Sequence, residues 1–213
     1  MTATRPGLFN ALPDFAFAAV FLVTWVAPRT FGDQMVKWLL LVMLMEFIVI
    51  HSAAFMGTVA LSNADRGKRT MGILGFGLLY TLFAGGFSLG FRSWWPLGSF
   101  WGQTGNRLLG VIVGQVPDEE QQAFIRRGWA ATAMFYLLGC FATVLLPVPR
   151  LGLTPAVVAT QHIPGGGMWV NQPWRVLAFG FLYFALVGWS ELSGHAWAGP
   201  RKPAGPSTAA STR

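Results

Sequence analysis

The chain has 213 residues, of which 54% are hydrophobic and only 11% charged. A soluble domain carries about 25% charged residues, so this composition excludes an ordinary soluble protein and predicts an all-α, polytopic integral membrane helical bundle. The formal net charge of +7 is spread over loops and ends without a basic-aromatic cluster. We therefore interpret the charge as a signal of membrane orientation, and we predict the lipid bilayer and no nucleic acid as a partner.

The first two apolar segments are expected to cross the membrane. Residues 8–27 form the first, for which a cleaved signal peptide is the alternative. Asp14 interrupts its apolar stretch, which favours an uncleaved span. Residues 36–61 form the second, where Glu46 and His51 are the ionisable residues after Lys37. About 20 apolar residues cross the hydrocarbon layer, so this segment is long enough.

A short basic loop at 62–70 leads to a third expected span at 71–91. This span is rich in glycine, and Gly86 and Gly90 have the GxxxG spacing that lets a neighbouring helix approach closely. Two glycines at this spacing are common in a chain with 26 of them, so the motif indicates little alone.

Residues 93–115 form a fourth segment with a narrow polar stripe. Steps of three and four residues place its polar and small side chains on one helical face, namely Ser99, Gln103, Asn106, Gly110 and Gly114. We expect this face to point into the bundle and the apolar faces to point to lipid. A re-entrant or interfacial segment is the alternative, which would give five spans in place of six.

The remaining chain predicts two further spans. Acidic residues at 118–120 and Arg126 and Arg127 fit the start and end of a short extramembrane helix that runs into a fifth span at 129–146. A loop broken by proline and glycine covers 147–173, and a sixth span covers 174–197. We expect one transmembrane domain over 1–198 and a disordered tail over 199–213.

Six spans place both termini on one side of the membrane. Of the 15 basic residues, nine then lie on the side of the termini and five on the opposite side. The remaining one, Arg107, lies within a span. The excess of Lys and Arg marks the cytoplasmic side, so we expect both termini in the cytoplasm of a bacterial inner (plasma) membrane.

Ionisable residues inside the spans are the candidate functional residues, because charge is costly in hydrocarbon. At a rise of about 1.5 Å per residue, Asp14, His51, Arg107 and Glu191 are expected at similar depths in the cytoplasmic half. Such a buried polar cluster either ties helices together or forms a proton or anion site. Asp14 or Glu191 is the expected partner of Arg107. Secondary candidates are Glu46, His195, Gln103 and Asn106.

Cofactor signals are incomplete. Glu191 and His195 are four residues apart and could supply half of a metal site, but no second pair follows. Haem b needs two axial ligands, and the depths expected for His51 and His195 differ by about 12 Å. One cysteine, Cys140, excludes an intrachain disulfide. We predict no cofactor, with haem b or a metal as the alternative.

No recognised hydrolase motif is present, so the sequence argues against an enzyme without excluding one built on Glu46, His51 and Ser52. We favour a non-catalytic subunit of a larger membrane complex, with protein partners or further copies of the chain bound at the glycine-rich third span and at 91–101. The alternative is a small transporter or channel for protons or a small solute that uses the buried cluster.

Overall fold

The computed structural model describes residues 6–114, 117–195 and 197, and this part of the chain folds into helices without a strand. Eight helices form there: α1 (Pro6–Val26), α2 (Met35–Ala60), α3 (Arg66–Gly90), α4 (Trp95–Val113), α5 (Glu119–Leu145), α6 (Pro155–Thr160), α7 (Met168–Asn171) and α8 (Pro173–Leu192). Six of them are long and two are short. The fold is therefore all-α, as the composition predicted.

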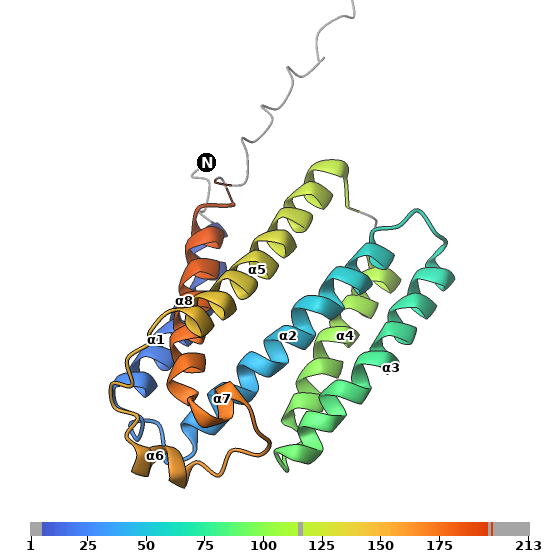
Figure 1. The fold of residues 1–213 in the computed structure, drawn as a ribbon. Coiled ribbons are helices and arrows are strands. Elements are labelled where there is room, and N and C mark those ends of the chain that lie inside the picture. Colours follow the sequence, from blue (N-terminus) through green and yellow to red (C-terminus); the bar gives the residue numbers. More distant parts are fainter. Residues whose placement is uncertain (1–5, 115–116, 196, 198–213) are drawn as a thin grey trace, which may run out of the picture.

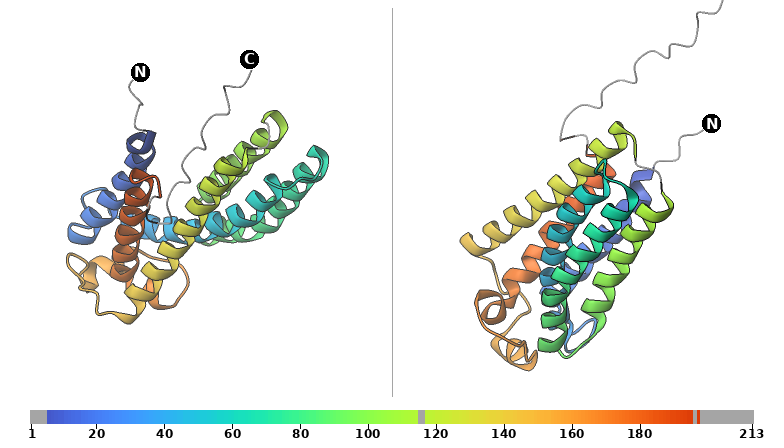
Figure 2. Two further views of the ribbon diagram at one scale, coloured as in Figure 1. Left: turned by 90° about the horizontal axis from the view of Figure 1, so that it is seen from above. Right: turned by 90° about the vertical axis from the view of Figure 1, so that its right-hand side faces the viewer.

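The long helices form an antiparallel bundle organised around α2 (Figure 1). In further views, α1 and α8 lie side by side at one edge, and α3 and α4 lie together at the other (Figure 2). Helix α2 contacts α3, α4, α5 and α8, so it joins the two groups. The start of α1 and the end of α8 lie at the same end of the bundle.

Within the described residues, five helices are long and apolar enough to cross a membrane: α1 from Leu8, α2, α3, α5 and α8. This confirms a multi-pass membrane helical bundle. Helix α4 has 19 residues and does not reach the same hydropathy. It nevertheless packs along α3, from Ser88 opposite Leu97 to Gly77 opposite Thr104, and so lies at the depth of a membrane-spanning helix.

Two aspartates fix where helices begin. The Asp65 side chain accepts a hydrogen bond from the backbone N–H of Lys68 at 2.9 Å, an N-cap that starts α3 at Arg66. The loop expected over 62–70 is therefore wrong in its second half. Asp118 accepts in the same way from the N–H of Gln121 at 2.8 Å. The extramembrane helix expected there does run into the fifth span, as one helix from Glu119 to Leu145.

The C-terminal span is shorter than the sequence predicted. Helix α8 ends at Leu192, and Gly194 and His195 then adopt positive φ angles of 62° and 56°, which turn the chain out of the helix. The loop expected at 147–173 contains the two short helices α6 and α7. The tail predicted to be disordered, 199–213, lies outside the described residues.

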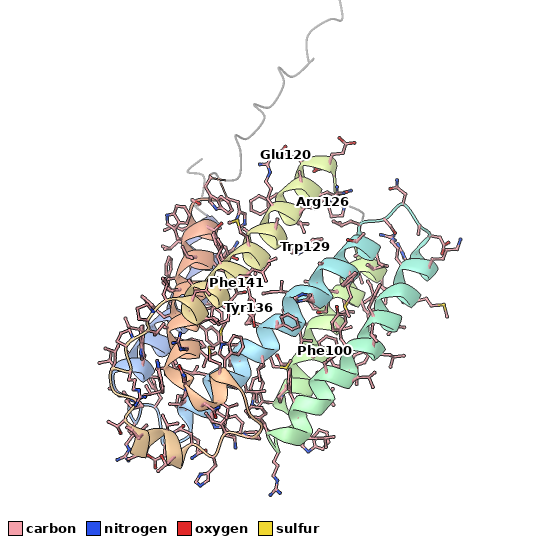
Figure 3. All side chains as sticks on the ribbon, in the orientation of Figure 1. Phe100, Glu120, Arg126, Trp129, Tyr136 and Phe141 are labelled. Atoms are coloured by element: carbon pink, nitrogen blue, oxygen red, sulfur yellow. The ribbon has the colours of Figure 1, made fainter. Side chains whose placement is uncertain are left out.

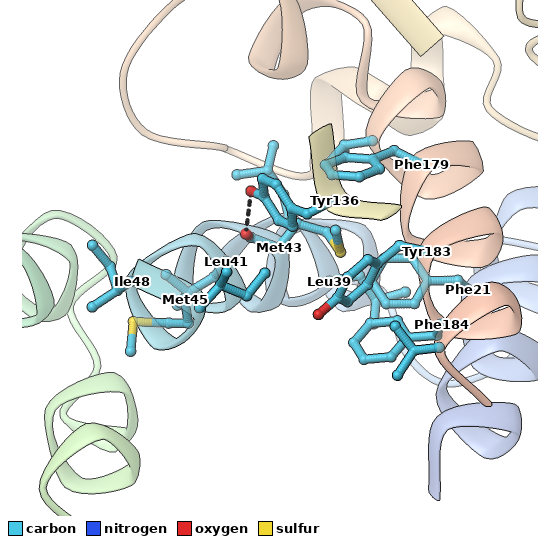
Figure 4. Packing of buried hydrophobic residues seen from close by; sticks show 14 of the residues in the cluster. Phe21, Leu39, Leu41, Met43, Met45, Ile48, Tyr136, Phe179, Tyr183 and Phe184 are labelled. Carbon is cyan, nitrogen blue, oxygen red and sulfur yellow. Dashed lines mark hydrogen bonds between the residues drawn. The ribbon is translucent and has the colours of Figure 1, made fainter. Parts of the chain in front are cut away.

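A cluster of buried aromatic and aliphatic side chains lies where α2, α5 and α8 meet (Figure 4). The Tyr136 hydroxyl donates to the backbone oxygen of Met43 at 2.9 Å, which ties α5 to α2. The ring of Tyr136 packs edge-on against Phe179 and Tyr183 of α8, with centroids 4.8 and 5.6 Å away. This junction holds α2 and α8 at the separation that lets Glu46 of α2 meet Tyr183 of α8.

Candidate functional site

The predicted four-residue cluster separates into parts, and its two carboxyl groups stay together. Asp14 on α1 and Glu191 on α8 lie where these two helices pack along each other. The space beside Gly188, one turn before Glu191, brings the Asp14 side chain close to α8. Two carboxyl groups on facing helices can share one proton, because a protonated carboxyl donates a hydrogen bond to a carboxylate.

Glu46 on α2 joins this pair from the side of the bundle core. Its carboxyl oxygen accepts a hydrogen bond from the Tyr183 hydroxyl of α8 at 3.0 Å. Tyr183 is 2% exposed, so the bond forms in an environment without competing water. The acidic residues in this part of the bundle are therefore Asp14, Glu46 and Glu191, from α1, α2 and α8.

Arg107 lies away from these carboxyl groups, so the expected ion pair with Asp14 or Glu191 does not form. Its Nη1 donates instead to the Ser52 hydroxyl oxygen at 3.4 Å and to the Met56 sulfur at 3.3 Å, both on α2. The reason is the position of α4, which packs on α3 and α2 at the edge of the bundle opposite α1 and α8. In the described part of the chain, Asp65 with Lys68 is the one salt bridge.

His51 is separate from both groups. Its Nδ1 lies 2.8 Å from the backbone oxygen of Phe47, one turn earlier on α2, and its ring lies 4.0 Å from the Phe47 ring. The neighbouring Ser52 turns toward α4 and donates to the oxygen of Val49 at 3.1 Å. These contacts are the ordinary ones of a packed helical histidine and serine.

The polar stripe of α4 points outward, where the sequence predicted that it points inward. Its buried residues are Pro96, Phe100, Thr104 and Val111. Ser99, Gln103, Asn106 and Gly110 are exposed. Periodicity finds a polar face, but the packing partner decides which face is buried. Here Gly77 of α3 leaves room for the side chains of Trp101 and Thr104. The face of α4 that carries these two residues therefore packs against α3.

The outward stripe lies on the flank of α4 that adjoins α2. Trp101 marks the flank toward α3, and Arg107, which contacts Ser52, marks the flank toward α2. At 100° per residue, Gln103 and Asn106 follow Arg107 around the helix on the side away from α3. Added Cβ atoms would meet no neighbour within 4 Å at the four glycines of this outer surface, Gly98, Gly102, Gly105 and Gly110.

His195 forms a buried contact between the end of α8 and α5. It is 8% exposed, and its Nδ1 lies 2.7 Å from the Ser190 hydroxyl oxygen. The indole N–H of Trp197 donates to the same oxygen at 2.7 Å, so the serine proton is free for His195 Nδ1. Burial lowers the pKa of His195 below its usual value. The helical pairing expected between Glu191 and His195 is absent because α8 ends between them.

No group of three His, Cys, Asp or Glu side chains that could hold a metal occurs among the described residues. The haem and metal alternatives stay predictions. One groove of about 510 Å³ lies between α2, α3 and the segment around α7, and its lining is apolar apart from backbone. Leu40, Phe87 and Trp169 are typical of that lining, which offers lipid or an apolar side chain a place and no acid or base for catalysis.

Besides Tyr136, helix α5 places the large side chain of Trp129 against α2. Trp129 lies on the side of α5 that faces α2, whereas Glu120 and Arg126 lie at the free end of the helix (Figure 3). The indole of Trp129 covers Gly57 so closely that a Cβ atom added at Gly57 would overlap the ring. Neither this pair nor Tyr183 was predicted from the sequence. A glycine amid large apolar residues was the signal for Gly57, and one of only three tyrosines was the signal for Tyr183.

Comparison with known proteins adds no relative, because no protein-family model, curated protein or solved structure matches the chain. The class that the fold defines is a multi-pass integral membrane protein of helical type. Its role must therefore be inferred from its own residues.

Proposed function

We propose that the chain is a non-catalytic subunit of a larger membrane complex and that the outer face of α4 receives a transmembrane helix of another subunit. The observation that supports this most is the exposure of Gln103 and Asn106 on a helix that packs along membrane-spanning α3. Both termini would lie in the cytoplasm of a bacterial inner membrane, in line with nine basic residues against five.

The energetic argument concerns the two amide side chains. An amide transferred from water to hydrocarbon without a hydrogen-bond partner costs about 4–8 kcal/mol on a cyclohexane scale. Facing acyl chains, Gln103 and Asn106 would have no partner from lipid. A helix from another subunit would supply donors and acceptors, and hydrogen bonds between transmembrane helices contribute about 0.6–2 kcal/mol each.

The glycines define what kind of helix fits. Gly98, Gly102 and Gly105 present bare backbone on the outer surface of α4, which allows close approach of a second backbone. We therefore expect a partner helix with small residues and a hydrogen-bonding side chain at the depth of Asn106. The outer face of α3 differs, because Leu78, Leu82 and other large apolar side chains are exposed there and suit lipid.

Site-specific photo-crosslinking in the native membrane tests the proposal. A photoreactive amino acid at Asn106 is expected to give one discrete crosslinked protein band. The matched control is the same amino acid at Leu82, which is 72% exposed on α3 and is expected to crosslink to lipid. Crosslinking of position 106 to lipid alone, as at position 82, would refute the docking face.

A proton-transport role is the second candidate, and the Asp14–Glu191 pair favours it. The two carboxyl groups are partly exposed on neighbouring helices, and Glu46 lies on α2, which also packs against α8. Proton flux into liposomes measured for Glu191→Gln, with Glu119→Gln as an exposed control, separates the candidates. Loss of flux in Glu191→Gln alone would support transport, and the absence of flux in the unaltered protein would end it.

A further inference from the structure

We propose that Arg107 forms an anion site for a phosphate group at the junction of α2 and α4. The Cα atom of Arg107 lies about 9 Å before the end of α4, because six residues separate it from Val113. It is partly buried beside the apolar residues of α2. A charged group at this depth needs a counter-charge or strong acceptors to offset its lost hydration.

The protein does not supply that counter-charge. The chain has eight acidic side chains, all of them within the described residues, and none lies within 4 Å of Arg107. The two contacts that Arg107 makes are to a hydroxyl at 3.4 Å and a thioether sulfur at 3.3 Å, which are neutral acceptors. The Ser52 hydroxyl already donates to Val49, so it accepts from Arg107 and orients it.

The remaining donors suit a phosphate. Both contacts use Nη1, and within the described residues no hydrogen bond is found from Nε or Nη2. These two nitrogens form the edge of the guanidinium that binds two oxygens of one phosphate. Asn106, the preceding residue, is exposed. A phosphodiester of an anionic lipid and a free phosphate ion both offer this chemistry.

The position of the site favours access by a headgroup. The turn between α2 and α3 lies at the same end of the bundle as the end of α4 (Figure 1), and the start of α3 that follows it carries Arg66, Lys68 and Arg69. Basic residues at the membrane surface attract anionic lipid, at about 1 kcal/mol per residue. The basic start of α3 would concentrate phosphate groups near Arg107 without itself forming the site.

Native mass spectrometry of the full chain tests this site with phosphatidylglycerol and, separately, inorganic phosphate as probes. We compare Arg107→Met, which removes the charge but keeps side-chain volume, with Arg126→Met, an exposed arginine at the same end. Arg107→Met is expected to weaken phosphatidylglycerol binding at least tenfold, and Arg126→Met less than twofold. A tenfold loss seen with inorganic phosphate and not with the lipid would assign the site to the free ion.

Two outcomes would overturn the proposal. One is that Arg107→Met binds both probes as tightly as Arg126→Met does. If Arg107→Met does not fold, Arg107→Lys is measured in its place, and the second outcome is that Arg107→Lys binds the probes as tightly as the unaltered protein. Lysine keeps the charge but loses the two-nitrogen edge, so at least threefold weaker binding is expected, and unchanged binding would refute the site.

Discussion

The Tyr183 hydroxyl of α8 donates a hydrogen bond of 3.0 Å to the carboxyl group of Glu46 on α2. This contact joins the central helix α2 to the α1–α8 pair. It gives Glu46 a specific donor in the interior of the bundle, and it makes the tyrosine a positioning residue for that carboxyl group.

Tyr183→Phe should lower the free energy of unfolding by about 1–2 kcal/mol, because a buried polar group loses its partner. Equilibrium unfolding in detergent micelles measures this. Tyr80→Phe is the matched control, since no hydrogen bond from the Tyr80 hydroxyl is found in the described part of the chain. Equal effects of the two substitutions would show that the Glu46 contact contributes nothing.

Gly57→Ala should destabilise the contact between α2 and α5 by about 1–3 kcal/mol, because its Cβ would overlap the Trp129 indole. The same change at Gly85, where the Cβ position is open, should be neutral or stabilising by up to about 1 kcal/mol. Thermal unfolding of both variants checks this. Adding Trp129→Leu to Gly57→Ala should restore part of the loss, and failure to do so would contradict the contact.

Stability should fall in acid because of His195. Burial lowers its pKa, so the folded protein holds the ring neutral while the unfolded chain binds a proton near the usual value of 6.5. The contribution is therefore complete above pH 6.5 and is lost as the pH falls below that value, by no more than about 1.4 kcal/mol per pH unit for one proton. His195→Asn should flatten this decline in unfolding experiments from pH 5 to 8.

The exposed His162 provides the comparison for that experiment. His162→Gln should leave the pH dependence unchanged. If the decline is the same in His195→Asn as in the unaltered protein, another group causes it and the buried contact with Ser190 is not the origin.

Helix α4 should cross the membrane. In a Cys140→Ala background, single cysteines at Asn63 and Asp118 should react with an impermeant thiol reagent from one side, and a cysteine at Ser93 from the other. We expect Asn63 and Asp118 on the cytoplasmic side. Labelling of positions 93 and 118 from the same side would show that α4 does not cross.

The sequence was sufficient for the helical class and for the position of the spans. Long apolar segments bounded by charge locate helices in a bilayer, because the hydrocarbon layer sets the length and forbids unpaired backbone. The errors arose at the ends of helices, where a single residue determines at which position the helix begins or ends. Asp65 starts α3 earlier than hydropathy indicated, and the positive φ of His195 ends α8 sooner.

The polar residues were harder to place, because depth along a helix says nothing about rotation or neighbours. Asp14, Arg107 and Glu191 were expected together from depth alone, yet α4 lies at the opposite edge of the bundle from α1 and α8. The α4 stripe was identified correctly but given the wrong direction. Glycine at position 77 made the other face of α4 the one that packs.

The docking face on α4 is tested most directly by a native mass spectrum of the chain gently extracted from its own membrane. We predict further protein subunits at a fixed ratio to the 23.2 kDa chain, and their loss when Gln103→Leu and Asn106→Leu are combined. The unaltered protein found as a single chain, or an assembly that both substitutions leave intact, would contradict the account.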